Sequence, residues 1–341
     1  MRDILSDIEN WIALGEPIAL ATVVETWGSA PRRAGARMAV TPRGGIAGSV
    51  SGGCVEGAVF DAALSALRAG VPRLLHFGVA DETAWEVGLA CGGSIDIFVQ
   101  ALDADFFHAI RLRLKEETPC VHAIVIRGAE NILGREMLIL ENGDSRGSLG
   151  NEWNDAVLSF GKDALLQGFS RRAMLSEAVE IFLDVLLPPP TLVIVGGVHI
   201  ALDLVSLAKT LSYRTILVDP RKAWGSDERF PHVDELIQQW PEEAFQQIKV
   251  TRSTAIAMLT HDPKLDDPAL KIALASPAFY VGALGSKSTH AKRRERLLKD
   301  GLSESQLACL HAPIGLDIGA QSPAEIALAI MSEVVKAQRN Q

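Results

Sequence analysis

The spacing of hydrophobic positions divides the first half of the chain into strands and helices. Apolar and β-branched runs predict strands, and apolar residues at helical spacing predict helices. Helices are expected within residues 1–17 and at 55–69 and 105–115. Strands are expected at 18–26, 36–41, 46–50, 94–99, 121–127, 136–141 and 179–185. This mixture predicts an N-terminal α/β domain.

The second half of the chain alternates regularly between buried strands and helices. β-branched or apolar runs at 191–195, 215–218, 254–259 and 279–281 are separated by helical patterns at 200–211, 268–275 and 289–299. Ser322-Pro-Ala-Glu325 has the residues of a helix start, with a capping serine, a proline in the first turn and a following glutamate. Such alternation predicts a Rossmann-like, doubly wound parallel sheet.

Three consecutive prolines, Pro188 to Pro190, separate the two patterns. Prolines stiffen the backbone and remove N–H donors, so they favour a boundary. A chain of 341 residues also exceeds what one hydrophobic core usually organises. We expect an N-terminal domain at 1–187, a linker at 188–190 and a C-terminal domain at 191–341. No internal repeat is detected.

Composition and charge exclude several classes of function. The formal net charge of -9, without any basic run interleaved with aromatic residues, disfavours binding to nucleic acid. No apolar run reaches the ~18 residues needed to span a membrane. The first residues mix acidic and apolar side chains, unlike a signal peptide. We expect a cytoplasmic protein, and the apolar strands suggest a homodimer.

The four cysteines fall into two groups. Cys120 and Cys309 have apolar neighbours and are expected to be buried core residues. Cys54 and Cys91 stand beside glycines instead. No spacing of cysteine and histidine matches a metal site, and no metal is expected.

The segment Gly48-Ser-Val-Ser-Gly-Gly-Cys-Val-Glu-Gly57 places glycines between a strand and a helix. Gly52 and Gly53 allow a tight turn whose N–H groups, together with the helix dipole, favour an anion such as phosphate. Cys54 stands where the helix is predicted to begin, and helix N-termini favour the thiolate form. The pattern fits a reactive or ligand-contacting thiol, and equally a tight turn around a small buried cysteine.

Two further glycine segments belong to the same domain. Cys91-Gly92-Gly93 precedes a strand, so a second thiol could approach the same ligand as Cys54. A loop at 28–35 contains Arg32 and Arg33, whose guanidinium groups suit phosphate or carboxylate. Either arginine could equally lie on a solvated loop.

The C-terminal domain has a glycine turn where a dinucleotide fingerprint would lie. Gly196 and Gly197 follow the first strand, His199 begins the helix, and Asp219 ends the next strand, where an acid would accept hydrogen bonds from a ribose. Val198 stands where the fingerprint requires glycine, which would crowd a pyrophosphate. The turn therefore indicates the fold more strongly than it indicates NAD(P).

A second anion-site candidate lies at 282–290, where a strand leads into a helix through Ser286 and Lys287. The basic run that follows, from Lys292 to Arg296, is interpreted as a solvated helix face. His261-Asp262-Pro263 and Asp266-Asp267 are interpreted as loop and helix-start signals.

Taken together, these motifs resemble the XdhC/CoxI family. The resemblance spans nearly the whole chain and rests on GSAPRRAGARM at 28–38, GSVSGGCVEG at 48–57, CGG at 91–93, VGGVHIA at 195–201, VDPR at 218–221, YVGALGSKSTHAKRR at 280–294 and PIGLDIGAQSPAEIA at 313–327. It implies an accessory chaperone that binds molybdenum cofactor (molybdopterin) as cargo and keeps it during sulfuration. It also implies delivery to a molybdenum hydroxylase apo-enzyme such as xanthine dehydrogenase, with a cysteine desulfurase as a further partner.

Matching to the family motifs assigns a ligand-side role to Cys54 and Cys91 and a glycine-loop role to Gly52 and Gly53. Val198 departs from the glycine that is usual in this family. Two alternatives stay open: an NAD(P)-dependent oxidoreductase with a redox-active thiol, and a regulatory nucleotide sensor without turnover.

Overall fold

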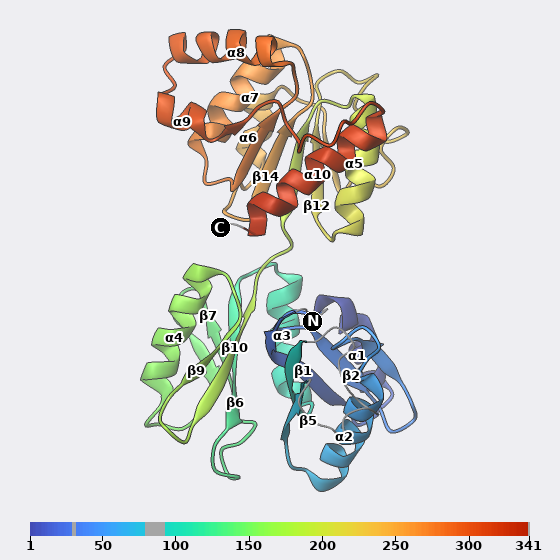
Figure 1. Cartoon of the computed structure of the whole chain (residues 1–341), viewed down its shortest axis with the longest axis vertical. Coiled ribbons are helices and arrows are strands. Elements are labelled where there is room, and N and C mark those ends of the chain that lie inside the picture. The colour runs from blue at the N-terminus through green and yellow to red at the C-terminus, as the bar shows by residue number, and fades with distance from the viewer. Residues whose placement is uncertain (29–31, 79–92, 340–341) are drawn as a thin grey trace. The chain divides into compact units, whose positions relative to one another are not determined.

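The computed structural model describes residues 1–28, 32–78 and 93–339. The chain divides into two compact units, Met1–Pro188 (unit 1) and Pro189–Gln341 (unit 2). The run of three prolines lies at this division. Figure 1 shows a separate set of sheets and helices in each unit.

Unit 1 contains two antiparallel five-stranded sheets. The first sheet has the order β3-β2-β1-β5-β4, with β1 at Ala19–Trp27, β2 at Arg37–Val40, β3 at Ile46–Gly48, β4 at Arg73–Phe77 and β5 at Ser94–Ala101. The second sheet has the order β8-β7-β6-β10-β9, with β6 at Cys120–Arg127, β7 at Glu136–Leu140, β8 at Ser145–Gly147, β9 at Arg171–Met174 and β10 at Glu180–Leu186.

Alternate residues of these strands face different layers of the unit, as the two-residue period of a strand requires. Val23 packs in the core beneath α2, whereas its neighbour Val24 packs between the two sheets with Phe98, Ile124 and Phe182. The helices of unit 1 lie at Leu5–Ala13 (α1, after a short 3₁₀ turn at Arg2–Ile4), Glu56–Ala69 (α2), Ala104–Lys115 (α3) and Asn154–Gln167 (α4).

Helix α2 shows how sequence determines one of these elements. Val59, Ala63 and Ala66 fall on one helical face and are fully or almost fully buried against the first sheet. Gly70 ends the helix in the left-handed conformation, with φ of 67°, which glycine adopts without steric cost. The predicted helix at 55–69 is therefore confirmed.

The two sheets repeat one topology, and the expectation of no internal repeat is wrong. Each sheet is built from a three-stranded meander, a helix and two more strands, in the same spatial order. The register also matches, because Met38 pairs with Gly48 in the first copy and Met137 with Gly147 in the second. The copies share backbone geometry and a few positions, which is too little for sequence comparison to detect.

Unit 2 contains one parallel sheet of six strands in the order β13-β12-β11-β14-β15-β16. Counted along the chain this is 3-2-1-4-5-6, the Rossmann order, and it confirms the predicted doubly wound fold. The strands are β11 (Thr191–Val195), β12 (Arg214–Val218), β13 (Glu235–Ile237), β14 (Thr254–Met258), β15 (Tyr280–Ala283) and β16 (Leu310–His311).

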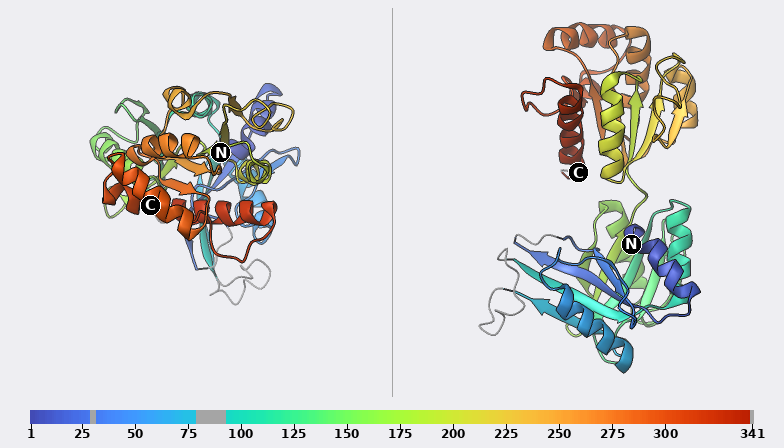
Figure 2. Two further views of the ribbon diagram at one scale, coloured as in Figure 1. Left: turned by 90° about the horizontal axis from the view of Figure 1, so that it is seen from above. Right: turned by 90° about the vertical axis from the view of Figure 1, so that its right-hand side faces the viewer.

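Helices cover both faces of this sheet. The helices are α5 (His199–Thr210), α6 (Pro241–Gln247), α7 (Pro263–Ala275), α8 (Lys287–Lys299), α9 (Glu304–Ala308) and α10 (Pro323–Arg339). Helices α5 and α10 lie side by side on one face, whereas apolar residues of α6 to α9 form the core on the other (Figures 1 and 2). Helix α7 starts five residues before the predicted position, because Asp262 caps it and Pro263 occupies its first turn.

Candidate functional site

The loop between β3 and α2 is organised around the carboxylate of Glu56. Glu56 Oε1 accepts hydrogen bonds from Ser49 Oγ at 2.7 Å and from the N–H groups of Ser51 and Gly52, both at 2.9 Å. Its Oε2 accepts from Ser51 Oγ at 2.5 Å and from Gly53 N at 2.8 Å. Five donors from one short loop therefore converge on one side chain.

This arrangement explains why the loop forms. Gly52 and Gly53 have φ of 81° and 121°, which aims successive N–H groups to one side. Burial alone would raise the pKa of Glu56, but hydrogen bonds from Ser51, Ser49 and the Ser51 N–H lower it to about 2. The anion held by the predicted glycine cradle is thus the chain's own carboxylate.

Cys54 lies at the exposed surface of this loop, next to Gly52 and Gly53, which are also exposed. Its N–H donates to Ser51 Oγ at 3.0 Å, so the backbone that positions the thiol belongs to the Glu56 network. Helix α2 begins two residues later. The alternative of a small buried cysteine in a tight turn is therefore wrong for Cys54.

Two of the glycine segments leave their strands in the same direction along the first sheet. Trp27 at the end of β1 pairs with Ser94 at the start of β5, and Arg37 at the start of β2 pairs with Thr22 of β1. The loop from 49 to 55 leaves β3 at the same end, because Gly48 pairs with Met38. The described residues 32–36 and the loop at 49–55 therefore adjoin strand ends that point towards the end of the sheet where β5 begins.

The other residues predicted in these loops are only partly described. Arg32 and Arg33 are exposed, as their interpretation as ligand-accessible cations requires. Gly93 is buried directly before β5. Cys91 and Gly92 lie outside the described residues, so their predicted roles stay predictions.

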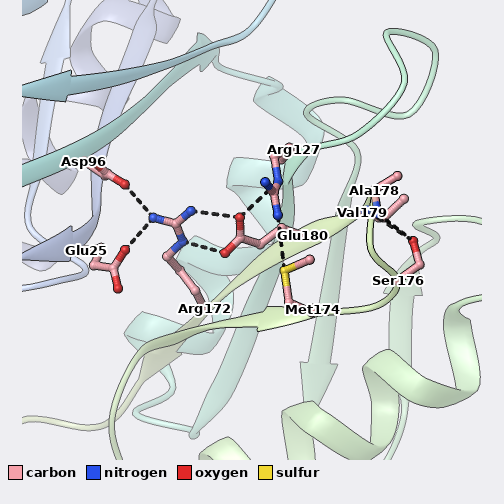
Figure 3. Close-up of polar contacts among 9 residues, drawn as sticks. All are labelled: Glu25, Asp96, Arg127, Arg172, Met174, Ser176, Ala178, Val179 and Glu180. Carbon is pink, nitrogen blue, oxygen red and sulfur yellow. Dashed lines mark hydrogen bonds and ion pairs between the residues drawn. The ribbon is translucent and has the colours of Figure 1, made fainter.

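Arg172 joins the two sheets at this end of unit 1 (Figure 3). From β9, its Nη1 donates to Glu25 of β1 at 2.6 Å and to Asp96 of β5 at 2.5 Å. Its Nε and Nη2 form a bidentate pair with Glu180 of β10, both at 2.8 Å. The hydrogen bonds that Arg172 donates to Glu180 outweigh burial and raise the pKa of Arg172. Arg127 also pairs with Glu180, so the carboxylate of Glu180 is shared by two arginines.

The Glu56 network leads to a prediction on acid stability. Because folding lowers the pKa of Glu56 from 4.5 to about 2, its contribution is present above pH 4.5 and disappears as the pH falls towards 2. Glu56→Gln should reduce the free energy of unfolding at neutral pH by roughly 1–2 kcal/mol, allowing for solvent screening. Urea unfolding across this pH range should show the difference between wild type and variant vanish near pH 2. Asp61→Asn, an exposed carboxylate on the same helix, should show no such trend.

The glycine turn of unit 2 is closed by the chain's own groups. The Gly197 N–H donates to Asp219 Oδ2 at 2.7 Å, and Arg221 forms bonds of 2.9 and 2.8 Å with the two oxygens of Asp219. A Cβ on Gly197 would lie 2.5 Å from the carbonyl oxygen of Trp224, so the backbone of that loop covers the turn.

Asp219 is therefore already satisfied where a ribose would need an acceptor. It is fully buried; burial alone would raise its pKa, but Arg221 and the Gly197 N–H hold that pKa below its ordinary value. Val198 is the N-cap of α5 and packs against the core, while His199 begins the helix and is exposed. The side chain of Val198 and the bonds within the turn therefore both disfavour binding of a dinucleotide here.

Comparison with known proteins gives the family. The family model described as "XdhC and CoxI family" matches residues 11–78, and the model described as "XdhC Rossmann domain" matches residues 192–334. The two matches fall in the two units in the same order. The chain belongs to the XdhC and CoxI family.

Relatives extend over almost the whole chain. The chain is 28% identical over 334 residues to a protein of Bacillus subtilis (strain 168) named as a probable xanthine dehydrogenase subunit, covering 95% of this chain and 94% of that protein. It is also 28% identical over 342 residues to the "Molybdenum cofactor insertion chaperone PaoD" of Escherichia coli (strain K12), covering 100% of this chain and 89% of the relative.

The fold is shared with a solved structure. A crystal structure from Bacillus halodurans, described as a xanthine dehydrogenase, superposes with a TM-score of 0.77 and 23% identity over 99% of this chain and 96% of that one. At this identity the match concerns the fold alone.

In this XdhC and CoxI family member, the candidate anion site at the start of α8 stays a prediction, and the interpretation of the basic run that follows it needs correction. Ser286 caps α8 by accepting from the Thr289 N–H at 3.1 Å, and Lys287 is exposed. The basic run is not simply a solvated face, because Arg293 is buried on Asp266 and Arg296 forms a bidentate pair with Asp267. The two aspartates lie inside α7, so the pairing joins residues far apart in sequence.

The cysteines outside the loop differ from one another. Cys120 is buried as predicted, and burial raises the pKa of its thiol to about 12. Cys309 is exposed, so the prediction of a buried core cysteine is wrong there. Helix α9 is short, and its apolar contacts are made by Leu307 and the following Leu310, which leaves Cys309 facing outward.

Glu56 and Ser51 organise this loop, and sequence reasoning missed them. They do not form the capping box that a sequence can reveal, because Glu56 is the first residue of α2, lies five positions after Ser51 and follows Val55 as the N-cap.

Within the described ranges, no helix combines the length and the apolar character that a membrane span requires. Likewise, no group of three or more His, Cys, Asp or Glu side chains in those ranges is arranged to hold a metal ion.

Proposed function

We propose that this protein binds molybdenum cofactor as cargo and supports its insertion into a molybdenum hydroxylase such as xanthine dehydrogenase. Membership of the XdhC and CoxI family supports this proposal, as do the names of the Bacillus subtilis and Escherichia coli relatives. The proposal treats the cofactor as a passenger that is taken up and released.

The observation that supports it most is the exposed thiol of Cys54 on a loop held in place by Glu56. A thiolate is a soft ligand and suits a soft metal centre or the sulfur chemistry around it. A single exposed donor binds its cargo without enclosing it, which allows transfer to the apo-enzyme.

The surroundings of Cys54 suit the remaining groups of the cofactor. Arg32 and Arg33, on the loop before β2, are exposed and can pair with a phosphate through bidentate hydrogen bonds. The N–H groups of Ser51 and Gly52 are occupied by Glu56, so we assign the phosphate to the arginines and not to the glycine turn.

Three finer parts of the proposal rest on the family resemblance. The protein keeps the cofactor during sulfuration, receives sulfur from a cysteine desulfurase, and uses Cys91 as a second thiol beside Cys54. A homodimer in the cytoplasm is the expected state. Light scattering at micromolar concentration tests the dimer directly.

Substitution of the thiol tests the proposed function. Cys54→Ser nearly preserves volume but removes the soft ligand, so cofactor retention after co-expression with the cofactor pathway should fall about tenfold, equivalent to about 1.4 kcal/mol. Bound molybdopterin is measured together with thermal stability, which should not change because the side chain is exposed.

Cys309→Ser is the matched control, since it removes another exposed thiol from the other unit. It should leave cofactor content unchanged. Cofactor content in the Cys54→Ser/Cys91→Ser double variant equal to that of the wild type would remove the thiols from the mechanism.

A further inference from the structure

Unit 2 contains a cavity of about 120 Å³, enough for roughly four water molecules. It lies between the first turns of two helices, with Pro263 and Asp266 from α7 and Ser288 and Thr289 from α8. These helices follow β14 and β15, which are neighbouring parallel strands. The positive ends of two helix dipoles therefore meet at this cavity, and both favour an anion.

Arg293 lines the cavity and is only 1% exposed. Its Nη2 donates to Asp266 Oδ2 at 3.1 Å and to the Leu284 carbonyl at 2.9 Å. Its Nε and Nη1 are buried and have no hydrogen-bond partner among the described residues. A buried guanidinium with free donors is costly unless a further acceptor is bound.

The charge around the cavity is positive. Lys292, Arg293 and Arg296 line it, and Asp266 is the single carboxylate among the lining residues. Arg296 is already paired with Asp267, so Lys292 and Arg293 supply the available positive charge. Asp266 is itself engaged, because it accepts from the Thr260 hydroxyl as well as from Arg293. An incoming anion therefore meets more positive than negative charge.

The start of α8 also favours an anion. Its first turn has no acidic residue to offset the dipole and begins with Lys287. Cations near a helix N-terminus destabilise the helix unless negative charge compensates. Gly285 precedes the helix with φ of 144°, and a Cβ there would lie 3.2 Å from Thr289 Cγ2 and 3.7 Å from Arg293 Nη1. Glycine thus keeps the space beside the unpaired nitrogen open.

We propose that this cavity binds the phosphate group of a small phosphomonoester. A tetrahedral dianion matches two converging helix ends, hydroxyls from Ser288 and Thr289, and a guanidinium with donors to spare. The site is separate from the glycine turn after β11, whose Gly197 N–H is already bound to Asp219. It does not depend on the proposed cargo, which we assign to unit 1.

Calorimetric titration of the full chain tests the site, with inorganic phosphate and glycerol 2-phosphate as probes in chloride of matched ionic strength. The wild type should bind both, and the ester at least as tightly as the free ion. Lys292→Gln combined with Ser288→Ala changes two exposed lining residues and should weaken binding about tenfold or more. Lys299→Gln, which removes an exposed charge at the other end of α8, should bind like the wild type.

Arg293→Gln should abolish binding, and circular dichroism shows whether that variant folds. The test of the site does not depend on the Arg293→Gln variant, because the Lys292→Gln/Ser288→Ala variant changes exposed residues of the same cavity. Absence of binding at about 10 mM phosphate, which corresponds to less than about 3 kcal/mol, would overturn the site. Equal affinity in the double variant would also overturn it, and exclusion of the ester would overturn the assigned ligand class.

Discussion

Replacing Asp184 with alanine is expected to lower the free energy of unfolding by about 3–5 kcal/mol, the usual cost of leaving a buried charge without its partner. Asp184 lies on β10 and accepts a hydrogen bond from Arg37 Nη2 of β2, so the pair joins the two sheets of unit 1. The Arg37 side chain is fully buried, and that of Asp184 is 3% exposed. Ser170 Oγ also donates to Asp184, at 2.9 Å.

The guanidinium of Arg37 has little else to bind. Its Nε and Nη1 have no hydrogen-bond partner within the described parts of the chain, and His122 Nδ1 lies 3.5 Å from Nη2, at the limit of a hydrogen bond. His122 is in turn held by Glu136 at 2.8 Å. Loss of Asp184 therefore removes the one carboxylate among the described residues that pairs with the buried cation.

Arg172→Ala is the matched control for Asp184→Ala. It also breaks a link between the sheets, but the Arg172 side chain is 18% exposed, so water can replace part of its contacts. Its cost should be about 1–2 kcal/mol, measured in the same urea titration. Arg37→Met combined with Asp184→Leu should recover much of the loss, because it removes both charges. An equal loss in the free energy of unfolding for Asp184→Ala and Arg172→Ala would show that burial does not determine how strongly the Arg37–Asp184 pair stabilises unit 1.

The doubly wound fold of unit 2 could be predicted because its local signals agree with one another. The four central strands, β12, β11, β14 and β15, are short apolar runs with β-branched residues, and α5, α7 and α8 have apolar residues at helical spacing. The short edge strands β13 and β16 and helix α6 lack such signals and were not predicted. Ser322 and Glu325 illustrate a recognisable helix start, since Glu325 Oε2 accepts from the Gln321 and Ser322 N–H groups at 2.7 and 2.9 Å. Because periodicity and capping agreed, the helices and strands could be identified. The alternation of strands with helices then implied a parallel sheet.

The repeat in unit 1 could not be predicted for a physical reason. Strand β8 has three residues, Ser145 to Gly147, all exposed, so no apolar pattern marks it. Strand β9 is only half buried. These edge strands are defined by hydrogen bonds to β7 and β10, which involve the backbone and place little constraint on side-chain type.

The candidate sites depend on contacts between residues that local patterns treat separately. The importance of Cys54 was visible from its glycines, but the role of Glu56 needs the folded loop that brings five donors to its carboxylate. Arg293 appeared solvated because Asp266, its partner, lies 27 positions away on another helix. Charge and burial together, not spacing, distinguish such an arginine from a surface one.

Gly48→Ala is expected to destabilise unit 1 by about 3 kcal/mol or more, and to displace the loop that presents Cys54. Gly48 has φ of 77°, which already disfavours alanine. A Cβ would also lie 2.3 Å from the Arg37 carbonyl oxygen and 2.7 Å from Ile4 Cγ2. That same carbonyl accepts from the Ser49 N–H at 2.9 Å, so relieving the clash breaks the first contact of the loop.

The repeat supplies both a replicate and a control for Gly48→Ala. Gly147→Ala meets the same obstacle in the second sheet, where a Cβ would lie 2.4 Å from the Glu136 carbonyl oxygen, so it should cost a similar amount. For the same loss of stability, Gly147→Ala should lower cofactor retention much less than Gly48→Ala does, because no thiol follows Gly147. Gly44→Ala, in the same hairpin as Gly48 with φ of 88° but nothing within 4 Å, should cost only about 1 kcal/mol. Equal urea midpoints for the three variants would contradict the steric argument, since only the close carbonyl distinguishes Gly48 and Gly147 from Gly44.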